Sequence, residues 1–189
     1  MKVGLILASA RQGRNGELIS QWLMDQFRKR PDIQVKLIDL REWSFPAYEH
    51  EAGPRIAETK FHAGSLEHQW FQLISEMDAF VVLTPEYNHG YPGSLKNALD
   101  SIYTPWNYKP VAFASYGFSA SGARAIEQLR LVTIELRMIP IRDELNISLN
   151  LTFDGSLSKR AIQMIDELVW MGEVMSAARV QPLVSSLVS

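Results

Sequence analysis

Three polar stretches of this sequence carry the residues whose types could do chemistry. "SARQGRNG" (9–16) mixes hydroxyl, guanidinium and amide side chains with glycines. "PEYNHGYPG" (85–93) places a carboxylate, a phenol and an amide in succession, and "SYGFSASG" (115–122) is small and rich in hydroxyl groups. Each stretch follows a short apolar run. Whether the three stretches meet therefore depends on the elements that position them.

The first stretch has the composition of an anion site. Backbone N–H groups at the start of a helix, with the helix dipole behind them, attract phosphate. The side chains that could add charge or hydrogen bonds are Ser9, Arg11, Arg14 and Asn15. Neither G-x-G-x-x-G nor the P-loop pattern ending in G-K-[ST] is present. A phosphate cradle and a solvated loop with two surface arginines both stay open from these residues alone.

The other two stretches suit a flat ligand. Residues 85–93 offer alternating donors and acceptors for the edge of a planar heteroaromatic ring, although a plain turn before a helix is also compatible. In residues 115–122, Gly117 and Gly122 allow a ligand to approach the backbone closely, and a plain turn is again the alternative. Together the three stretches could hold one phosphate and one flat ring.

Strands and helices alternate around these stretches. Apolar runs predict strands at 3–8, 79–84, 110–115 and 138–141. Alternation predicts a further strand at 33–40, with Ile33, Val35, Leu37 and the terminal Leu40 as the inward-facing candidates. Apolar residues at helical spacing predict helices at 17–30, 66–77, 95–102, 126–136 and 158–177. Residues 42–63 have no period and predict a long loop.

This alternation predicts an α/β fold. Strands that are apolar on both faces indicate a doubly wound, five-stranded parallel sheet with helices on both faces. We expect one domain spanning 1–189. Ligands of such sheets bind outside the carboxyl ends of the strands, where 9–16, 85–93 and 115–122 would lie together.

Composition excludes several classes of function. The chain has 47% apolar residues, a formal charge of −2 and no cysteine, which argues against nucleic acid and membrane partners and against disulfides or thiolate chemistry. No apolar run is long enough for a signal peptide or a membrane span, so the expected location is the cytoplasm. The four histidines lack metal-ligand spacing, so no metal site is expected.

Three longer segments carry a resemblance to a known family. "ASARQGRNGE", "TPEYNHGYPGSLKNALD" and "SYGFSASGARA" resemble the motifs of the NADPH-dependent FMN reductase family, which includes flavodoxin-like quinone, azo and chromate reductases. The resemblance covers nearly the whole chain, and its middle motif is highly specific. It implies a flavodoxin-like fold, FMN as cofactor, and NADPH or NADH as co-substrate.

The resemblance also implies roles for individual residues. Those that would bind the FMN phosphate are Ser9, Arg11, Asn15 and Gly16; those that would line the isoalloxazine are Pro85, Glu86, Tyr87 and Asn88; those that would meet its other edge are Ser115, Tyr116 and Gly117. Many members carry a second serine where this chain reads "GRNGE", so Arg14 is a further candidate, for the FMN phosphate or the 2′-phosphate of NADPH.

The implied chemistry belongs to the flavin. A nicotinamide passes hydride to flavin N5, and a small-molecule electron acceptor then takes its place; no catalytic side chain is required, so Glu86 is expected to be a structural anchor. Trp43 and Trp106 fall in connections, which suggests a subunit contact or a lid, and 42–63 could cover the flavin. The expected assembly is a homodimer or a dimer of dimers.

Other functions stay open from the sequence. A flavodoxin-type electron carrier would have the same fold, but such carriers usually present a strongly acidic surface, unlike this chain. A phosphoacceptor domain would need acidic residues after the first strand, where this chain has Ala8-Ser9-Ala10-Arg11. A non-catalytic flavin sensor is the remaining alternative.

Overall fold

The computed structural model describes residues 1–150 and 153–180. Its strands are β1 (Lys2–Leu7), β2 (Gln34–Asp39), β3 (Ala79–Pro85), β4 (Pro110–Gly117) and β5 (Ile139–Ser148). Its helices are α1 (Gly16–Phe27), α2 (Pro54–Ala57), α3 (Leu66–Ser75), α4 (Gly93–Asp100), α5 (Ala123–Glu135) and α6 (Gly155–Arg179), with 3₁₀ turns at Glu58–Lys60 and Thr104–Trp106.

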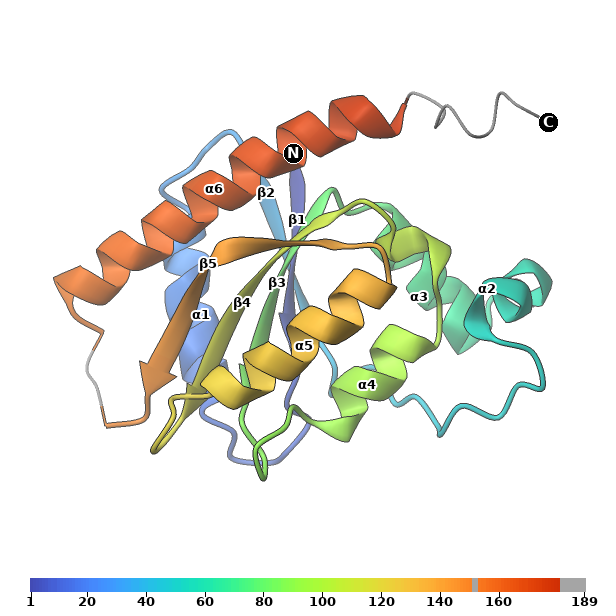
Figure 1. Ribbon diagram of the computed structural model, residues 1–189, viewed down its shortest axis with the longest axis horizontal. Helices are drawn as coiled ribbons and strands as arrows, with labels where there is room; N and C mark the ends of the chain where they lie inside the picture. The colour runs from blue at the N-terminus through green and yellow to red at the C-terminus, as the bar shows by residue number, and fades with distance from the viewer. Residues whose placement is uncertain (151–152, 181–189) are drawn as a thin grey trace.

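The five strands form one parallel sheet in the order β2-β1-β3-β4-β5. This order is that of the flavodoxin-like doubly wound folds, and it confirms the predicted fold class. The strands β1, β3 and β4 are buried almost throughout because both of their faces are covered by helices. All strands point their carboxyl ends toward the lower edge of Figure 1.

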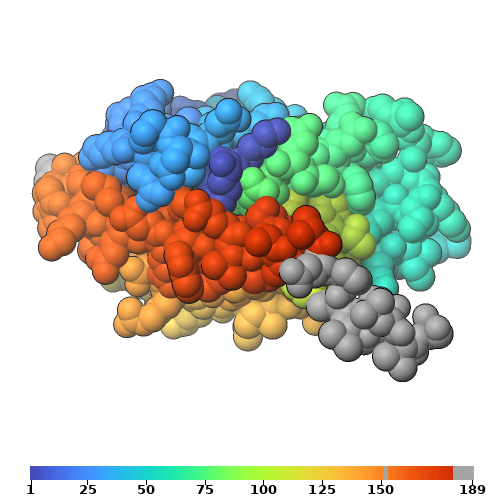
Figure 2. Space-filling model, turned by 90° about the horizontal axis from the view of Figure 1, so that it is seen from above, coloured from blue at the N-terminus to red at the C-terminus, as the bar shows by residue number. Residues whose placement is uncertain are grey.

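Helices cover the two faces of the sheet in separate layers. One apolar cluster joins the sheet to α1 and α6, through side chains such as Leu23 and Leu168. The other joins it to α3, α4 and α5, through side chains such as Trp70 and Leu129. Figure 2 shows α6 running across the molecule, with α1 on one side of it and α5 on the other.

Several element boundaries differ from the sequence prediction. The strand predicted at 138–141 extends to Ser148, with a register shift opposite Val111 and Phe113. Its second half alternates polar and buried residues because β5 is an edge strand, and that alternation hides it from a search for apolar runs. Leu37, predicted to face inward, is 41% exposed, whereas its neighbour Ile38 is buried.

The segment 42–63 is also more structured than predicted. It contains α2 and the first 3₁₀ turn, and Trp43 lies against the buried ring of Trp70 with centroids 4.9 Å apart. Trp106 is fully buried in the core, so the prediction of an exposed contact or lid is wrong for this residue. The rings of Trp43 and Trp106, although both lie in connections, pack against the apolar core.

The order of the strands reverses between β1 and β3, and that point positions the loops of interest. The chain leaves β1 toward β2 on one side and β3 toward β4 on the other. A crevice opens at such a switch point in open α/β sheets. Among the described residues, no helix combines the length and the apolar character needed to cross a membrane.

Candidate active site at the carboxyl edge of the sheet

A cleft of about 270 Å³ lies at this switch point. It is formed by the ends of β3 and β4 and the loops that follow β1, β3 and β4, with Arg124 from the start of α5 and Leu149 just after β5. The residues that line it are Arg11, Asn15, Pro85, Glu86, Tyr87, Tyr116, Gly117, Phe118, Ser119, Ala120, Gly122, Arg124 and Leu149. The structure therefore brings the three polar stretches of the sequence to one place.

The start of α1 forms one end of the cleft. Asn15 is the N-cap residue, but its side chain makes no capping hydrogen bond, and the first amide groups of a helix have no acceptor within it. The guanidinium of Arg11 lies 5.9 Å from the ring centroid of Tyr87 and forms no ion pair within the described residues. This end of the cleft therefore offers free N–H donors and a positive charge, which suit an anion.

A hydrogen bond joins the loop after β1 to the loop after β3. The hydroxyl groups of Ser9 and Tyr87 lie 2.8 Å apart, and the Ser9 side chain is fully buried. Ser9 Oγ also accepts a long hydrogen bond of 3.4 Å from the Arg11 amide. Ser9 thus fixes the two loops against each other beneath the cleft and does not line it.

The loop after β3 folds into a tight turn. Tyr87 and Gly90 exchange two backbone hydrogen bonds, at 2.8 and 3.0 Å, around Asn88 and His89. Both central residues have positive φ, of 50° and 69°, as a type I′ turn requires. Gln128 holds the turn by donating to the His89 carbonyl at 2.9 Å. Asn88 is exposed at its tip and does not line the cleft.

Glu86 connects the loops after β3 and β4. Its amide donates to the Tyr116 carbonyl at 3.1 Å, and its Oε1 accepts from Nε of Arg124 at 2.6 Å. The other carboxylate oxygen, Oε2, is buried and has no hydrogen-bond partner among the described residues. A buried polar atom without a partner is costly, so this oxygen is an available acceptor for a ligand.

Tyr116 carries a second unpartnered atom. Its hydroxyl is buried and makes no hydrogen bond within the described residues. A Cβ on Gly16 would lie only 2.8 Å from this oxygen, so Gly16 leaves the space at the start of α1 that the phenol needs. Burial raises the pKa of Tyr116 to about 12, so the phenol stays protonated at neutral pH and can donate.

Glycines shape the loop after β4. A Cβ on Gly117 would approach the Gly122 amide nitrogen at 3.2 Å, and Gly122 itself has a φ of 90°. Ser115 lies underneath, where its Oγ bonds the Ser121 carbonyl at 2.9 Å and Asn146 at 3.0 Å. Ser115 therefore supports the loop from below, while Gly117 lines the cleft.

The candidate residues thus fall into two groups. Those at the cleft are Arg11, Asn15, Pro85, Glu86, Tyr87, Tyr116 and Gly117; those that support or flank it are Ser9, Arg14, Gly16, Asn88 and Ser115. Arg14 is only 5% exposed and bonds Asp39, so its guanidinium faces away from the cleft.

Six lining residues were not among the site candidates named from the sequence: Phe118, Ser119, Ala120, Gly122, Arg124 and Leu149. Three of them were missed for different reasons. Arg124 stands in the "SASGARA" motif, where an arginine two residues after a glycine was the available signal. Phe118 is 73% exposed at the rim, and an exposed aromatic residue in a hydroxyl-rich loop was a second signal. Leu149 had no signal, because β5 was predicted to end eight residues earlier.

Fold and cleft together define a class of protein. A parallel sheet in this order, with an anion-ready helix start and a polar crevice at the switch point, is typical of flavodoxin-like proteins that bind a phosphate-bearing ring. The comparisons agree with this class. A family model for NADPH-dependent FMN reductases matches residues 1–151. The chain belongs to the NADPH-dependent FMN reductase family.

Named relatives lie in the same family. The chain is 31% identical to the NAD(P)H-dependent FMN reductase LOT6 of Saccharomyces cerevisiae over 146 residues, which is 73% of this chain and 76% of the relative. It is 32% identical to the NAD(P)H-dependent FMN reductase C4B3.06c of Schizosaccharomyces pombe over 148 residues, 77% of this chain and 73% of the relative. The expected FMN and NAD(P)H dependence is confirmed as a property of the family.

A solved structure supports the fold. The flavoenzyme NAD(P)H:(acceptor) oxidoreductase FerB of Paracoccus denitrificans superimposes with a TM-score of 0.75 at 20% identity. The match covers 92% of this chain and 98% of FerB. At this identity the likeness concerns the fold alone.

Proposed function

We propose that this protein is an FMN-containing oxidoreductase that takes a hydride from NADPH or NADH and reduces a small acceptor by two electrons. The acceptor class comprises quinones, azo compounds, chromate and free flavin. One observation carries the proposal: the cleft combines a free helix start and Arg11 with two buried polar atoms, Glu86 Oε2 and Tyr116 Oη, that have no hydrogen-bond partner in residues 1–150 and 153–180.

The residues present fit FMN. Arg11, Asn15 and the first amides of α1 would hold the phosphate through charge-assisted hydrogen bonds. Segments 85–87 and 116–118 would hold the ring between them, with Glu86 supplying an acceptor, while the Tyr116 hydroxyl lies at the start of α1 and would donate at the phosphate end. When bound, the flavin supplies the hydride and electron chemistry, while the protein supplies position and electrostatics.

Steady-state turnover tests the enzyme proposal. The FMN-loaded protein should oxidise NADPH or NADH when a small quinone is the acceptor and no other protein is present. An electron carrier of the same fold would not sustain this reaction without a partner protein. Absence of turnover with quinone, azo dye, chromate and free flavin alike would overturn the proposal.

A pair of variants tests the residue assignments. Arg11→Ala should weaken FMN by roughly 10- to 100-fold, because a hydrogen bond to a charged group contributes about 1.5–3 kcal/mol. Turnover at saturating FMN should stay normal. Arg55→Ala, an exposed arginine on α2, is the matched control and should bind FMN as the wild type does. Unchanged affinity in Arg11→Ala would remove Arg11 from the phosphate site.

Substitution of Asn88 tests the proposed contacts with the isoalloxazine ring. The side chain is exposed at the tip of the turn that follows Tyr87, and we expect it to meet the ring edge only when FMN is bound. Asn88→Ala should slow flavin reduction, or shift the flavin potential, more than it lowers FMN affinity. Stopped-flow reduction and a redox titration at saturating FMN measure both effects. A wild-type rate with an unchanged potential would remove Asn88 from the ring site.

The exposed ring of Phe118 points to flat acceptors. A planar aromatic molecule that enters the cleft would cover this ring, which loses contact with water on stacking. Phe118→Ala should raise KM for flat quinones and azo compounds severalfold and leave KM for chromate unchanged. Leu131→Ala is the control, because Leu131 is also 73% exposed but lies on α5 outside the cleft.

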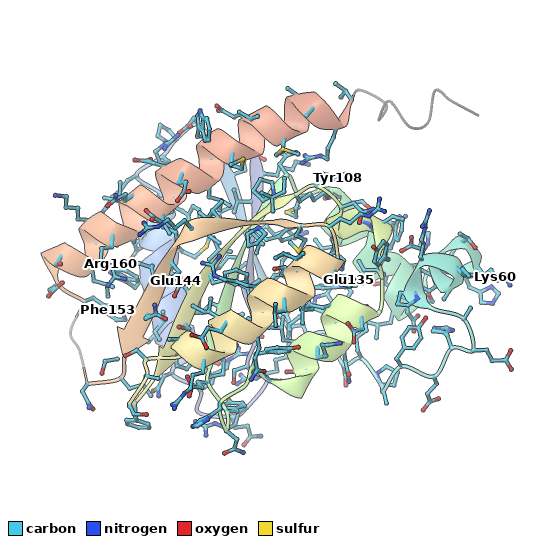
Figure 3. The ribbon with its side chains drawn as sticks, in the orientation of Figure 1. Lys60, Tyr108, Glu135, Glu144, Phe153 and Arg160 are labelled. Atoms are coloured by element: carbon cyan, nitrogen blue, oxygen red, sulfur yellow. The ribbon has the colours of Figure 1, made fainter. Side chains whose placement is uncertain are left out.

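The homodimer and the cytoplasmic location stay predictions. Trp106 is buried and supplies no subunit contact, whereas Tyr103 and Tyr108 are partly exposed. The Tyr103 hydroxyl donates to the carbonyl of Glu135, which Figure 3 labels together with Tyr108. Light scattering at micromolar concentration should report a dimer or a tetramer; a monomer would contradict the expected assembly.

A further inference from the structure

Two arginines bind carbonyl oxygens of the loop between β1 and α1. Nη1 of Arg14 donates to the carbonyl of Ser9. Nη2 of Arg41, just after β2, donates to the carbonyl of Arg11 at 2.7 Å. The two acceptors lie two residues apart, in the part of the loop that approaches the start of α1.

Two carboxylates hold these arginines in place. Asp39 accepts from Nη1 of Arg14 at 2.6 Å, from its Nη2, and from the Arg41 amide at 2.9 Å. Glu17 accepts from Nε of Arg14 at 3.2 Å and from Nη1 of Arg41 at 2.9 Å. Two positive and two negative side chains thus form one neutral network that joins the loop, α1 and β2.

The guanidinium of Arg14 is buried within this network. Its side chain is 2% exposed, and hydrogen bonding to Asp39 raises the pKa of its guanidinium above the ordinary value. Burial opposes ionisation of Asp39, but hydrogen bonds from Arg14 and the Arg41 amide bring the pKa of Asp39 below its usual value. Four of the five N–H groups of Arg14 are therefore engaged, and its buried side chain does not line the cleft.

The hydrogen bonds to the Ser9 and Arg11 carbonyls affect how an anion would bind to this loop. A carbonyl oxygen that faces a phosphate repels it, whereas an amide group attracts it. With the Ser9 and Arg11 carbonyls held by guanidinium groups, the Arg11 side chain and the first amides of α1 remain for the cleft. The neutral network also leaves Arg11 as the uncompensated charge of this loop within the described residues.

We propose that Arg14 and Arg41 are positioning residues that make this site select phosphate-bearing flavin over its dephosphorylated form. They act by fixing the loop and touch no ligand themselves. The proposal rests on the proposed FMN site and adds the cause of its selectivity.

Equilibrium titrations with FMN and with riboflavin test the proposal. Riboflavin has the same ring and lacks the phosphate, so it reports the ring site alone. Arg14→Met should weaken FMN roughly tenfold or more while riboflavin affinity changes less than about twofold. Arg41→Ala should weaken FMN roughly threefold to tenfold, because it releases one carbonyl.

Arg41→Ala also keeps the proposal testable if Arg14→Met fails to fold. The Arg41–Glu17 pair is exposed at 40% and 50%, so its loss should leave folding intact even where loss of buried Arg14 does not. Arg28→Ala breaks a comparable exposed pair with Asp25 at the far end of α1 and is the control. It should bind both flavins as the wild type does.

Four outcomes would overturn the proposal. Equal weakening of FMN and riboflavin would show a general structural role. A raised KM for NADPH with unchanged FMN affinity would make Arg14 a direct contact of the nucleotide. Wild-type protein that binds FMN no more tightly than riboflavin would remove the selectivity itself, and wild-type protein that binds neither would contradict the proposed function as well.

Discussion

Two buried cations, Arg14 and Lys109, show how differently the two edges of the sheet are built. They are 5% and 6% exposed, respectively, and each donates to a backbone carbonyl. Arg14, at the carboxyl edge, is paired with Asp39. Lys109, just before β4, donates to the carbonyls of Ile74 and Ser75, at 2.7 and 3.1 Å, and has no carboxylate partner in the part of the chain that the structure describes.

The difference appears in their protonation. Asp39 raises the pKa of Arg14, whereas burial, with no directly bonded carboxylate to offset it, lowers the pKa of Lys109 to about 7. Arg14, beside the cleft, thus stays protonated and is neutralised by Asp39, whereas Lys109, at the opposite edge, loses its proton near neutral pH. The anion site proposed for this loop requires the first arrangement, because a cation that lost its proton near neutral pH would release the loop.

The titration of Lys109 should give the largest effect. The folded state lowers the pKa of this amine to about 7. In the unfolded chain it is about 10.4. Between these values the unfolded state binds more protons, so stability should rise with pH by on the order of 4 kcal/mol. Lys109→Met should lack this rise. Urea unfolding of both proteins from pH 7 to 10 measures the difference; parallel curves would contradict the assignment.

Removal of the Arg14 side chain should have the next largest effect on the free energy of unfolding. Arg14→Met leaves the carboxylate of Asp39 partly buried without its partner, and breaking a buried pair in this way costs roughly 3–5 kcal/mol. Because the folded-state pKa of Asp39 is depressed, the contribution of the pair is complete above about pH 4 and is lost as pH falls further. Urea unfolding at pH 7 should therefore show a larger loss for Arg14→Met than for Lys109→Met. The reverse order would break the comparison.

Gly122 tests the rigidity of the carboxyl edge without changing a charge. A Cβ there would lie 2.8 Å from the Tyr116 amide nitrogen, on a backbone with φ of 90°. Gly122→Ala should cost roughly 2 kcal/mol through strain and displaced backbone, and should weaken FMN as well. Gly93→Ala, where a Cβ meets nothing within 4 Å, is the matched control in thermal unfolding. Equal stability of the two variants would contradict the close packing.

The smallest effect concerns His89. This residue is exposed and has a φ of 69°, a conformation that glycine adopts more readily. His89→Gly should cost less stability than a glycine elsewhere, by about 0.5–1 kcal/mol, because relief of the positive φ offsets the freedom that glycine adds to the unfolded chain. Thermal unfolding measures this change, with His62→Gly, on an exposed residue of ordinary φ, as the control. A loss of stability as large as that of the control would exclude strain at this turn.

Much of the fold could be predicted because its central strands are apolar on both faces. The runs at 79–84 and 110–115 differ from β3 and β4 by only one or two residues at their ends. The second half of β5 could not be found this way, since Arg142 and Asn146 alternate with buried residues at the edge of the sheet. A search for continuous apolar runs finds a strand most readily where both faces are covered alike.

The site was predictable in its location and less so in its details. Strand alternation brought 9–16, 85–93 and 115–122 to one edge, and the cleft lies there. The pairing of Arg14 with Asp39 could not be foreseen, because it joins residues 25 positions apart across neighbouring strands. Which loops are neighbours depends on the order of the strands in the sheet. The partners of a loop side chain therefore cannot be read from its local motif alone.

Amide hydrogen exchange with and without FMN tests most directly where the ligand binds. The account predicts slower exchange on adding FMN in peptides that cover 9–18, 85–92 and 115–124, at the carboxyl edge. Peptides that cover 74–80 and 106–112, around Lys109, should exchange at the same rate in both states. Protection around Lys109, or none in the three loops while FMN is bound, would contradict the account.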